Sequence, residues 1–330
     1  MSIIINSFVG LIGIAGLYWG GDFFISGASS LAKRFNISPL IIGLTVVAMG
    51  TSAPEFFVSG IAALSGHPTL SLGNVIGSNI ANILLILGIV SIFHIISGNR
   101  QLIVFDFPWL FFSYILLLIG VIIFASAKAS VLNIWLGLPM FCSLIIYLYI
   151  LYRKAKKEGE AVLQERLEID AVDDTSQKSI PIIFVLIVFG FSMLLAGSNM
   201  LINSAIWFAR EVFNVSERFI SLTVIAFGTS LPELVTSVVA AAKKESDISI
   251  GNIVGSNIFN TLGVAGFSAI LAPLPVVFPA FWIDFAVMLG ASVLLFLFLF
   301  LFKRVSIKAG FLFIILYVLY IAYLYNTRII

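Results

Sequence analysis

The sequence contains few charged residues. Asp, Glu, Lys and Arg make up 10% of its 330 residues, whereas apolar residues make up 61%. Soluble globular domains carry about 25% charged residues, so this composition excludes a soluble globular protein and predicts an integral membrane protein with the lipid bilayer as its partner. The net charge of +2 is too small to indicate nucleic-acid binding.

Cysteine and histidine are also scarce. Cys142 is the single cysteine, so the chain cannot form an internal disulfide. The two histidines do not form a His-Glu-x-x-His motif, and the sequence has no Gly-rich phosphate loop. These absences argue against an intramembrane metalloenzyme and a primary pump. We therefore expect a protein that is not an enzyme and has no cofactor.

Ten apolar runs are each long enough to cross a hydrocarbon core of about 30 Å as a helix. They cover residues 5–32, 38–64, 70–97, 104–126, 130–152, 180–208, 216–242, 248–271, 276–302 and 307–327. The sequence therefore predicts an all-α polytopic membrane protein with ten transmembrane helices.

The basic residues are divided unevenly between the two predicted sides of the membrane. Fourteen of the 18 Lys and Arg residues fall on one side, among them Lys33, Arg153 and Lys243, and four fall on the other. Because basic loops remain in the cytoplasm, we expect the richer side to be cytoplasmic and both termini to lie outside.

Two stretches occur twice. Gly-Thr-Ser-Ala-Pro-Glu at 50–55 returns as Gly-Thr-Ser-Leu-Pro-Glu at 228–233, and Gly-Ser-Asn-Ile-Ala-Asn at 77–82 returns as Gly-Ser-Asn-Ile-Phe-Asn at 255–260. Both return at the same offset of 178 residues, so the repeat is ungapped and rarely arises by chance.

A polar segment separates the two copies of the repeat. Residues 153–179 are predicted to form a cytoplasmic linker, helical in part, between a first five-helix repeat at 1–152 and a second at 180–330. Since five is odd, the second repeat must enter the membrane from the opposite side. Inverted-topology repeats of this kind are typical of secondary transporters, which hold their substrate near the midplane.

Glu55 and Glu233 lie in the middle of predicted spans. An ionised carboxylate there is costly unless it faces a partner or a water-filled cavity, and we expect the partner to be a cation. Each glutamate follows a proline, which leaves the carbonyl four residues earlier, at Gly50 or Gly228, without its helical donor. Carbonyl oxygens freed at this depth can become cation ligands.

Further polar residues repeat at helical spacing around the two glutamates. Thr51 and Ser52 share a helix face with Glu55. The third and eighth spans carry four-residue ladders, which consist of Asn74, Ser78 and Asn82 and of Asn252, Ser256 and Asn260. We expect the asparagines at 74, 79, 252 and 257 to join helices by hydrogen bonds. An all-oxygen set of this kind suits Ca²⁺ and Na⁺.

Three aspartates also lie in predicted spans. Asp22 lies toward the cytoplasmic end of the first span, and the position 178 residues later is Met200, so it has no acidic counterpart. We expect Asp22 to be peripheral to the ion site. Asp106 and Asp284 lie near span starts, where we expect them to cap helices.

The paired motifs resemble the alpha-repeats of Na⁺/Ca²⁺ exchangers in the cation/Ca²⁺ antiporter superfamily. The resemblance covers essentially the whole chain. It implies a secondary-active antiporter that exchanges Na⁺ for Ca²⁺ by alternating access. A compact chain without a large regulatory loop is typical of a prokaryotic member, so we expect it in the inner or plasma membrane. We also expect it to function as a monomer.

The resemblance also implies the ion ligands. The Ca²⁺ ligands would be Glu55 and Glu233 with the carbonyls of Thr51 and Thr229. The Na⁺ sites would use Ser52, Ser78, Ser230 and Ser256 with the carbonyls of Ala48 and Ala226. Asn82 and Asn260 would complete the central site. Asparagine at both of these positions resembles the K⁺-independent pattern.

Two other functions remain open. A Ca²⁺/H⁺ antiporter would use the same two glutamates, although the H⁺-coupled branch tends to carry a Gly-Asn-Ala-x-Glu-type motif in place of Gly-Thr-Ser-x-Pro-Glu. A passive cation channel would need a continuous pore, and nothing in the sequence resembles a selectivity-filter loop. The sequence does not decide between Na⁺ and H⁺ as the coupling ion.

Overall fold

The computed structural model describes residues 3–65, 68–123, 130–168, 178–212, 226–276 and 280–327. Within these ranges, eight helical stretches are long and apolar enough to cross a membrane, and a ninth span is formed by Pro39–Thr51 and Ala53–Leu64, which meet at a bend of 44°. The helical membrane architecture is confirmed. The count of ten is not fully confirmed, because the expected span 216–242 is described only from Ala226 onward.

Several of the helical stretches contain a π-helical segment, labelled η, between or before α-helical segments. Those before the linker are α1 Ile3–Phe35, α2 Pro39–Ile42, η1 Gly43–Val47, α3 Ala48–Thr51, α4 Ala53–Leu64, α5 Pro68–Ile80, η2 Ala81–Ile86, α6 Leu87–Phe93, η3 Leu102–Asp106, α7 Phe107–Ile123 and α8 Ile134–Glu168. Those after it are α9 Ile180–Glu211, α11 Ala226–Thr229, α12 Leu231–Ala242, α13 Ser246–Ile258, η5 Phe259–Ala265, α14 Gly266–Leu271, α15 Ala280–Phe302 and α16 Ile307–Thr327.

Two small antiparallel ribbons modify the expected all-α fold. Strand β1 (Ile96–Ser97) pairs with β4 (Arg304–Val305), and β2 (Ser130–Leu132) pairs with β3 (Leu274–Val276). Each ribbon joins a loop of the first half to a loop of the second, so the two halves are connected at both ends of the bundle.

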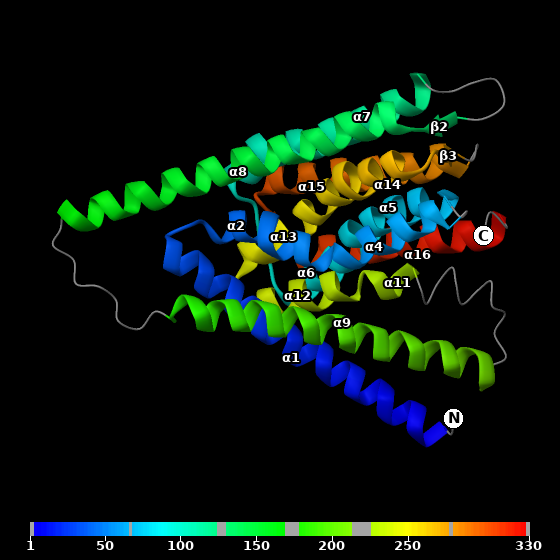
Figure 1. The fold of residues 1–330 in the computed structure, drawn as a ribbon, viewed down its shortest axis with the longest axis horizontal. Helices are drawn as coiled ribbons and strands as arrows, with labels where there is room; N and C mark the ends of the chain where they lie inside the picture. The colour runs from blue at the N-terminus through cyan, green and yellow to red at the C-terminus, as the bar shows by residue number, and fades with distance from the viewer. Residues whose placement is uncertain are drawn as a thin grey trace.

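The buried centre of the bundle consists of two equivalent spans. In Pro68–Phe93 and Ser246–Leu271, 78% and 83% of the residues in an apolar 18-residue window are buried. In the other six long spans this share is between 17% and 39%. In Figure 1 the helices α7 and α8 lie along one side of this centre, and α1 and α9 lie along the opposite side. The start of α1 and the end of α16 lie at the same end of the bundle.

Helices α1 and α9 form a closely packed pair. A Cβ added at Gly13 would come within 2.9 Å of the Gly197 carbonyl oxygen, and one added at Gly197 would come within 2.7 Å of the Gly13 carbonyl oxygen. Only glycine permits the two backbones to approach this closely, so the sequence of both helices is adapted to this contact.

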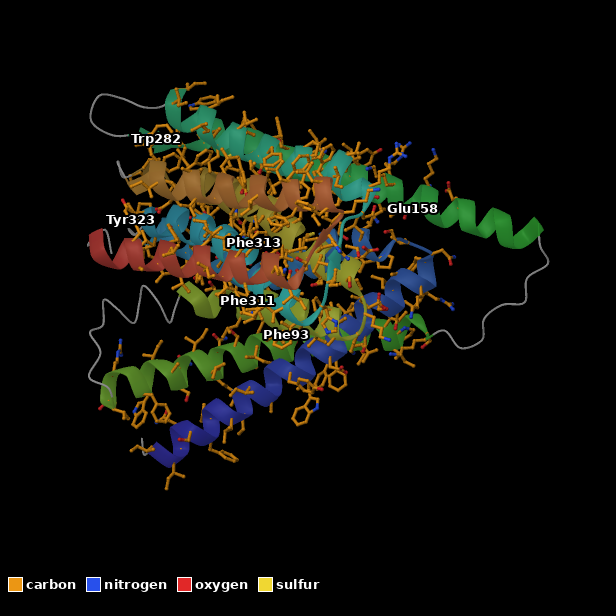
Figure 2. The ribbon with its side chains drawn as sticks, turned by 180° about the vertical axis from the view of Figure 1, so that it is seen from behind. Phe93, Glu158, Trp282, Phe311, Phe313 and Tyr323 are labelled. Atoms are coloured by element: carbon orange, nitrogen blue, oxygen red, sulfur yellow. The ribbon has the colours of Figure 1, made fainter. Side chains whose placement is uncertain are left out.

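Helix α8 continues beyond the expected span boundary at residue 152 and ends at Glu168. Its residues after 152 are rich in Lys, Glu and Ala, which are good helix formers. Figure 2 shows Glu158 where α8 extends past the other helices. There the Glu158 carboxylate accepts a 3.0 Å hydrogen bond from the Ser38 backbone N–H, next to the start of α2.

Candidate ion-binding site

Both repeated glutamates follow a break in a helix. Ser52 (φ −83°, ψ 5°) separates α3 from α4, and Ser230 (φ −90°, ψ 7°) separates α11 from α12. The proline that precedes each glutamate lacks an N–H and lies in the first turn of the second helix, where its missing donor does no harm. Glu55 and Glu233 therefore lie at helix N-termini, whose partial positive charge favours a carboxylate.

The two breaks hold each other's carboxylate. Ser52 Oγ donates to Glu233 Oε1 at 3.0 Å, and Ser230 Oγ donates to Glu55 Oε1 at 3.3 Å. Both glutamates are fully buried, at 0% exposure. The repeated motifs therefore meet at one place, and each half supplies a hydroxyl to the acid of the other half.

Several buried oxygen atoms of the expected cation ligands have no hydrogen-bond donor among the described residues. They are Oε2 of Glu55, Oε2 of Glu233, Oδ1 of Asn82 and Oδ1 of Asn260. Asn260 Nδ2 is also without a partner there. Buried polar atoms are nearly always hydrogen-bonded, and leaving one unsatisfied costs about 1–3 kcal/mol. Carboxylate and amide oxygens together are suitable ligands for a hard cation.

Asn82 and Asn260 occupy π-helical turns. Asn82 is the second residue of η2, and Asn260 is the second residue of η5. A π-helical turn widens the backbone locally and occurs frequently at functional sites. No signal in the sequence predicted these turns.

A reciprocal pair of hydrogen bonds joins the two central spans. Asn257 Nδ2 donates to the Asn79 carbonyl oxygen at 3.1 Å, and Asn79 Nδ2 donates to the Asn257 carbonyl oxygen at 3.4 Å. Asn82 Nδ2 donates to Asn257 Oδ1 at 2.9 Å, which fixes the Asn82 amide at the site. The expected role of Asn79 and Asn257 in joining helices is confirmed.

The remaining expected hydroxyls lie in the same polar cluster. Thr51 Oγ1 donates to Asn252 Oδ1 at 3.0 Å and lies 3.5 Å from Ser256 Oγ. Ser230 Oγ lies 3.3 Å from Ser78 Oγ. Thr229 is buried at the end of α11.

The structure gives less support to the expected carbonyl ligands at Ala48, Ala226 and Gly228. The Ala48 carbonyl accepts the Ser52 N–H at 3.0 Å and the Thr51 hydroxyl at 3.4 Å, so it already takes part in two hydrogen bonds. Ala226 is the first residue of α11, and its side chain lies outside the described part of the chain. The Gly228 carbonyl, which Pro232 deprives of its helical donor, accepts the hydroxyl of Ser198 from α9 at 3.1 Å. The sequence did not predict this contact, since Gly20 stands at the position equivalent to Ser198.

The glycines of the central spans behave differently in the two halves. A Cβ at Gly251 would come within 2.8 Å of the Leu40 carbonyl oxygen, and one at Gly255 within 2.8 Å of the Leu44 carbonyl oxygen. Close packing is therefore confirmed on α13. Gly73 and Gly77 have no such neighbour within 4 Å, and the segment that the repeat would place against them falls within 213–225, outside the described residues.

The described residues contain no cluster of three or more Asp, Glu, His or Cys side chains that could hold a metal ion, so Glu55 and Glu233 are the acids of this site.

Asp106 and Asp284 do not cap helices. Asp106 Oδ1 accepts the Tyr147 hydroxyl at 3.1 Å, and Asp284 Oδ1 accepts the Tyr320 hydroxyl at 2.8 Å.

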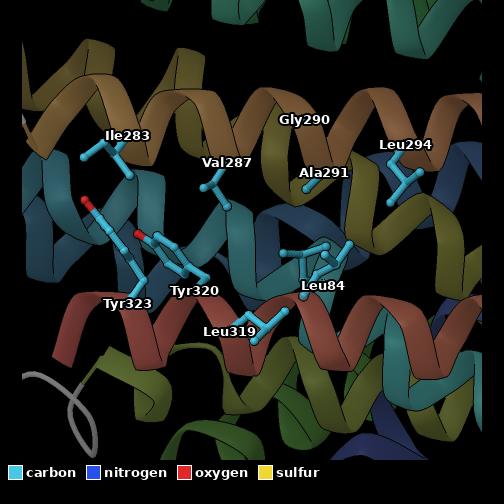
Figure 3. A pocket seen from close by; sticks show the side chains of 10 residues that line it. Leu84, Ile283, Val287, Gly290, Ala291, Leu294, Leu319, Tyr320 and Tyr323 are labelled. Carbon is cyan, nitrogen blue, oxygen red and sulfur yellow. The ribbon is translucent and has the colours of Figure 1, made fainter. Parts of the chain in front are cut away.

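A cavity of about 400 Å³ lies apart from the glutamates, between α15 and α16. Figure 3 shows its lining, which is aliphatic except for Tyr320 and Tyr323 and includes no acid. This cavity therefore contributes nothing to a cation site.

Comparison with known proteins supports the fold and the motifs. The sequence model of the family described as sodium/calcium exchanger protein matches residues 6–153 and 182–326, which include both copies of the repeat. This chain belongs to the sodium/calcium exchanger protein family.

Individual members of the sodium/calcium exchanger protein family match over most of their length. A putative antiporter, CaxA, from Alkalimonas amylolytica is 38% identical and covers 87% of both chains. The sodium/calcium exchanger MaX1 from Methanosarcina acetivorans is 29% identical and covers 90% of this chain and 92% of its own. A solved structure of the sodium-calcium exchanger NCX_Mj superimposes with a TM-score of 0.82 at 31% identity, covering 98% of this chain and 100% of its own. The predicted resemblance is confirmed, and the chain is an integral membrane protein.

Proposed function

We propose that this protein is a Na⁺/Ca²⁺ antiporter whose ions bind between Glu55 and Glu233. The observation that carries the proposal is the crossed pair of hydrogen bonds, Ser52 to Glu233 and Ser230 to Glu55, which leaves Oε2 of each buried carboxylate without a donor among the described residues. The family membership and the similarity to MaX1, which is named a sodium/calcium exchanger, support the same conclusion.

Calcium occupies the centre of the proposed site. Glu55 and Glu233 bind it with their carboxylates, and Asn82 and Asn260 face it with side-chain oxygens. The carbonyls of Thr51 and Thr229 supply further ligands. Two carboxylates neutralise one Ca²⁺, and oxygen ligands from both halves suit its preference for six to eight contacts.

Sodium ions occupy the flanking positions. Ser52, Ser78, Ser230 and Ser256 supply hydroxyl oxygens, and Ala48 and Ala226 supply carbonyl oxygens. Three Na⁺ ions would place more positive charge in the site than two carboxylates balance, and this excess favours release of Ca²⁺ when Na⁺ binds. Sodium and calcium therefore occupy the site in turn, which is the requirement for antiport.

The arrangement of the helices supports alternating access. The halves 1–152 and 180–330 form inverted repeats around the buried spans of α5 and α13. The α1–α9 pair slides across this centre and exposes the site to one side of the membrane at a time. The Ser198 hydroxyl on the Gly228 carbonyl links α9 directly to the helix break that precedes Glu233.

The protein functions as a monomer in a prokaryotic inner or plasma membrane. Both termini lie outside, and the linker at 153–179 lies in the cytoplasm, as the distribution of basic residues indicates.

The test is ⁴⁵Ca²⁺ uptake into proteoliposomes loaded with Na⁺ and diluted into choline medium, with an imposed pH gradient as the comparison. We expect uptake that requires internal Na⁺, saturates with Ca²⁺ and ignores the pH gradient. Uptake driven by the pH gradient alone would contradict Na⁺ coupling and establish a Ca²⁺/H⁺ antiporter. Non-saturable flux without counter-ion dependence would establish a channel.

A further inference from the structure

Lys243 connects the end of α12 to α1. Its Nζ lies 2.7 Å from Asp22 Oδ1 and donates to Ser26 Oγ at 2.6 Å and to the Asp22 carbonyl oxygen at 2.9 Å. The ammonium group thus uses three oxygens of α1. The Lys243 and Asp22 side chains are 29% and 39% exposed, so water and salt weaken the pair without removing it.

A second contact lies beside the first. Ser29 Oγ donates to Glu245 Oε1 at 2.5 Å. Asp22, Ser26 and Ser29 are spaced by four and three residues, which places them on one face of α1. We call these three residues, together with Lys243 and Glu245, the α1 latch.

The turn that carries the basic and acidic partners is well defined. Lys244 adopts a positive φ of 64°, and its N–H donates to the Ala241 carbonyl at 2.9 Å. The Glu245 N–H donates to the Ala240 carbonyl at 2.8 Å. This backbone closes α12 with a left-handed residue, as helix C-termini commonly do, and holds Lys243 and Glu245 toward α1.

The latch lies at an end of the bundle that is closed by backbone packing. A Cβ added at Gly43, in the segment that follows α1, would come within 2.6 Å of the Ile248 carbonyl oxygen on α13. The latch therefore holds α1 at the end of the bundle where η1 packs closely against α13.

The repeat does not carry the Asp22–Lys243 pair to the opposite end. The positions related by 178 residues to Asp22 and Lys243 are Met200 and Ser65. Ser204, equivalent to Ser26, donates to the Asn6 carbonyl oxygen at 2.7 Å instead. An inverted repeat without such differences would favour neither access state, whereas a charged contact at one end favours the state closed at that end.

We propose that the α1 latch is a one-sided positioning device that favours the state closed at the lysine-rich end, and that it must open each time the site becomes accessible there. The proposal rests on the alternating access proposed above. Asp22 and Lys243 act through the position of α1 and touch no transported ion.

The experiment measures the position of α1 by double electron–electron resonance. The spin labels are attached to Lys33→Cys on α1 and Lys308→Cys on α16, two exposed positions, in a Cys142→Ser background. The labelled full-length protein is studied in nanodiscs. Lys243→Met is compared with Lys244→Met, which removes the neighbouring exposed charge. We expect Lys243→Met to raise the ratio of the latch-open to the latch-closed distance population about 2- to 5-fold, the range for a half-exposed ion pair. We expect Lys244→Met to leave it unchanged.

Asp22→Asn provides the second arm. It should shift the same ratio, and the double variant Asp22→Asn/Lys243→Met should add little to either single change. A ratio unchanged in both single variants, while Na⁺ and Ca²⁺ still shift it, would overturn the latch and leave alternating access intact. A single α1 distance in every variant and ion condition would overturn the sliding of α1 and the latch together.

Discussion

Ser52 and Glu233 lie in different halves of the chain, 181 residues apart, and share a hydrogen bond of 3.0 Å. Its counterpart, from Ser230 to Glu55, is 3.3 Å long. Each serine interrupts a helix and each glutamate lies in the first turn of the next, so both breaks contribute to one buried polar centre. Neither half of the chain forms this centre alone, which makes its two acids the first targets for mutation.

Glu55→Gln and Glu233→Gln should each lower Ca²⁺ affinity about 100-fold or more. Removing one carboxylate leaves a single negative charge against a divalent ion in a site without bulk water, which is expensive. Calcium binding to the purified protein and ⁴⁵Ca²⁺ exchange measure the effect. The matched control is Asp284→Asn, since its amide oxygen can still accept the Tyr320 hydroxyl away from the site. Normal Ca²⁺ exchange in either glutamine variant would remove that glutamate from the ligand set.

Asn260→Asp should tighten cation binding about tenfold or change the Na⁺ dependence of exchange. Asn260 is fully buried, and neither its side-chain oxygen nor its nitrogen has a partner among the described residues. A third carboxylate there would be paired with the transported ions, whose attraction offsets its desolvation. Exchange assayed against Na⁺ and K⁺ concentration measures the change. Asn74→Asp, on the partly buried Asn74 beside Ser59, is the control. Unchanged Na⁺ and K⁺ dependence in Asn260→Asp would place Asn260 outside the ion site.

The sequence predicted the helical membrane fold because hydrophobic length is a strong local signal. It also brought Glu55, Glu233 and the polar residues around them into one hypothesis, because an ungapped repeat and buried charge are both readable in one dimension. The linker was predicted to be helical in part, and α8 does continue through charged residues to Glu168. Apolar content located the span but could not locate the end of the helix.

Other features depended on contacts between distant segments. The π-helical turns at Asn82 and Asn260 result from packing around the central spans and leave no periodic signature. Asp22 was predicted to be peripheral to the ion site, and its contact with Lys243 could not be predicted because the two residues are 221 positions apart in the sequence. The tyrosines that bind Asp106 and Asp284 could not be chosen from the sequence for the same reason.

Asn79→Ala should lower the free energy of unfolding by about 1–3 kcal/mol, because it removes the buried amide that donates to the Thr261 hydroxyl oxygen at 2.9 Å and to the Asn257 carbonyl oxygen at 3.4 Å. The Asn257 carbonyl keeps the Thr261 hydroxyl as a donor, so the cost falls mainly on the lost bond to Thr261. Thermal unfolding in detergent, followed by tryptophan fluorescence, measures the change. Asn74→Ala should have a smaller effect, since Asn74 is partly buried and, among the described residues, its amide donates only to Ser59. Equal melting temperatures for Asn79→Ala and the parent protein would contradict the joining role of the asparagine pair.

Gly255→Ala should reduce Ca²⁺ exchange at least about tenfold while the two glutamates stay in place. Its added Cβ would lie 2.8 Å from the Leu44 carbonyl oxygen and 2.8 Å from Ala48 Cβ, so η1 and α3 must move away from α13. Movement of α3 displaces Thr51 and Ser52, which lie at the C-terminal end of α3 and contact residues of the candidate site. Displacements of this size cost about 1–3 kcal/mol in a packed interior. Gly290→Ala is the control, because none of the described residues lies within 4 Å of its added Cβ. Parent-like exchange in Gly255→Ala would show that transport does not depend on the close packing of η1 and α3 against α13.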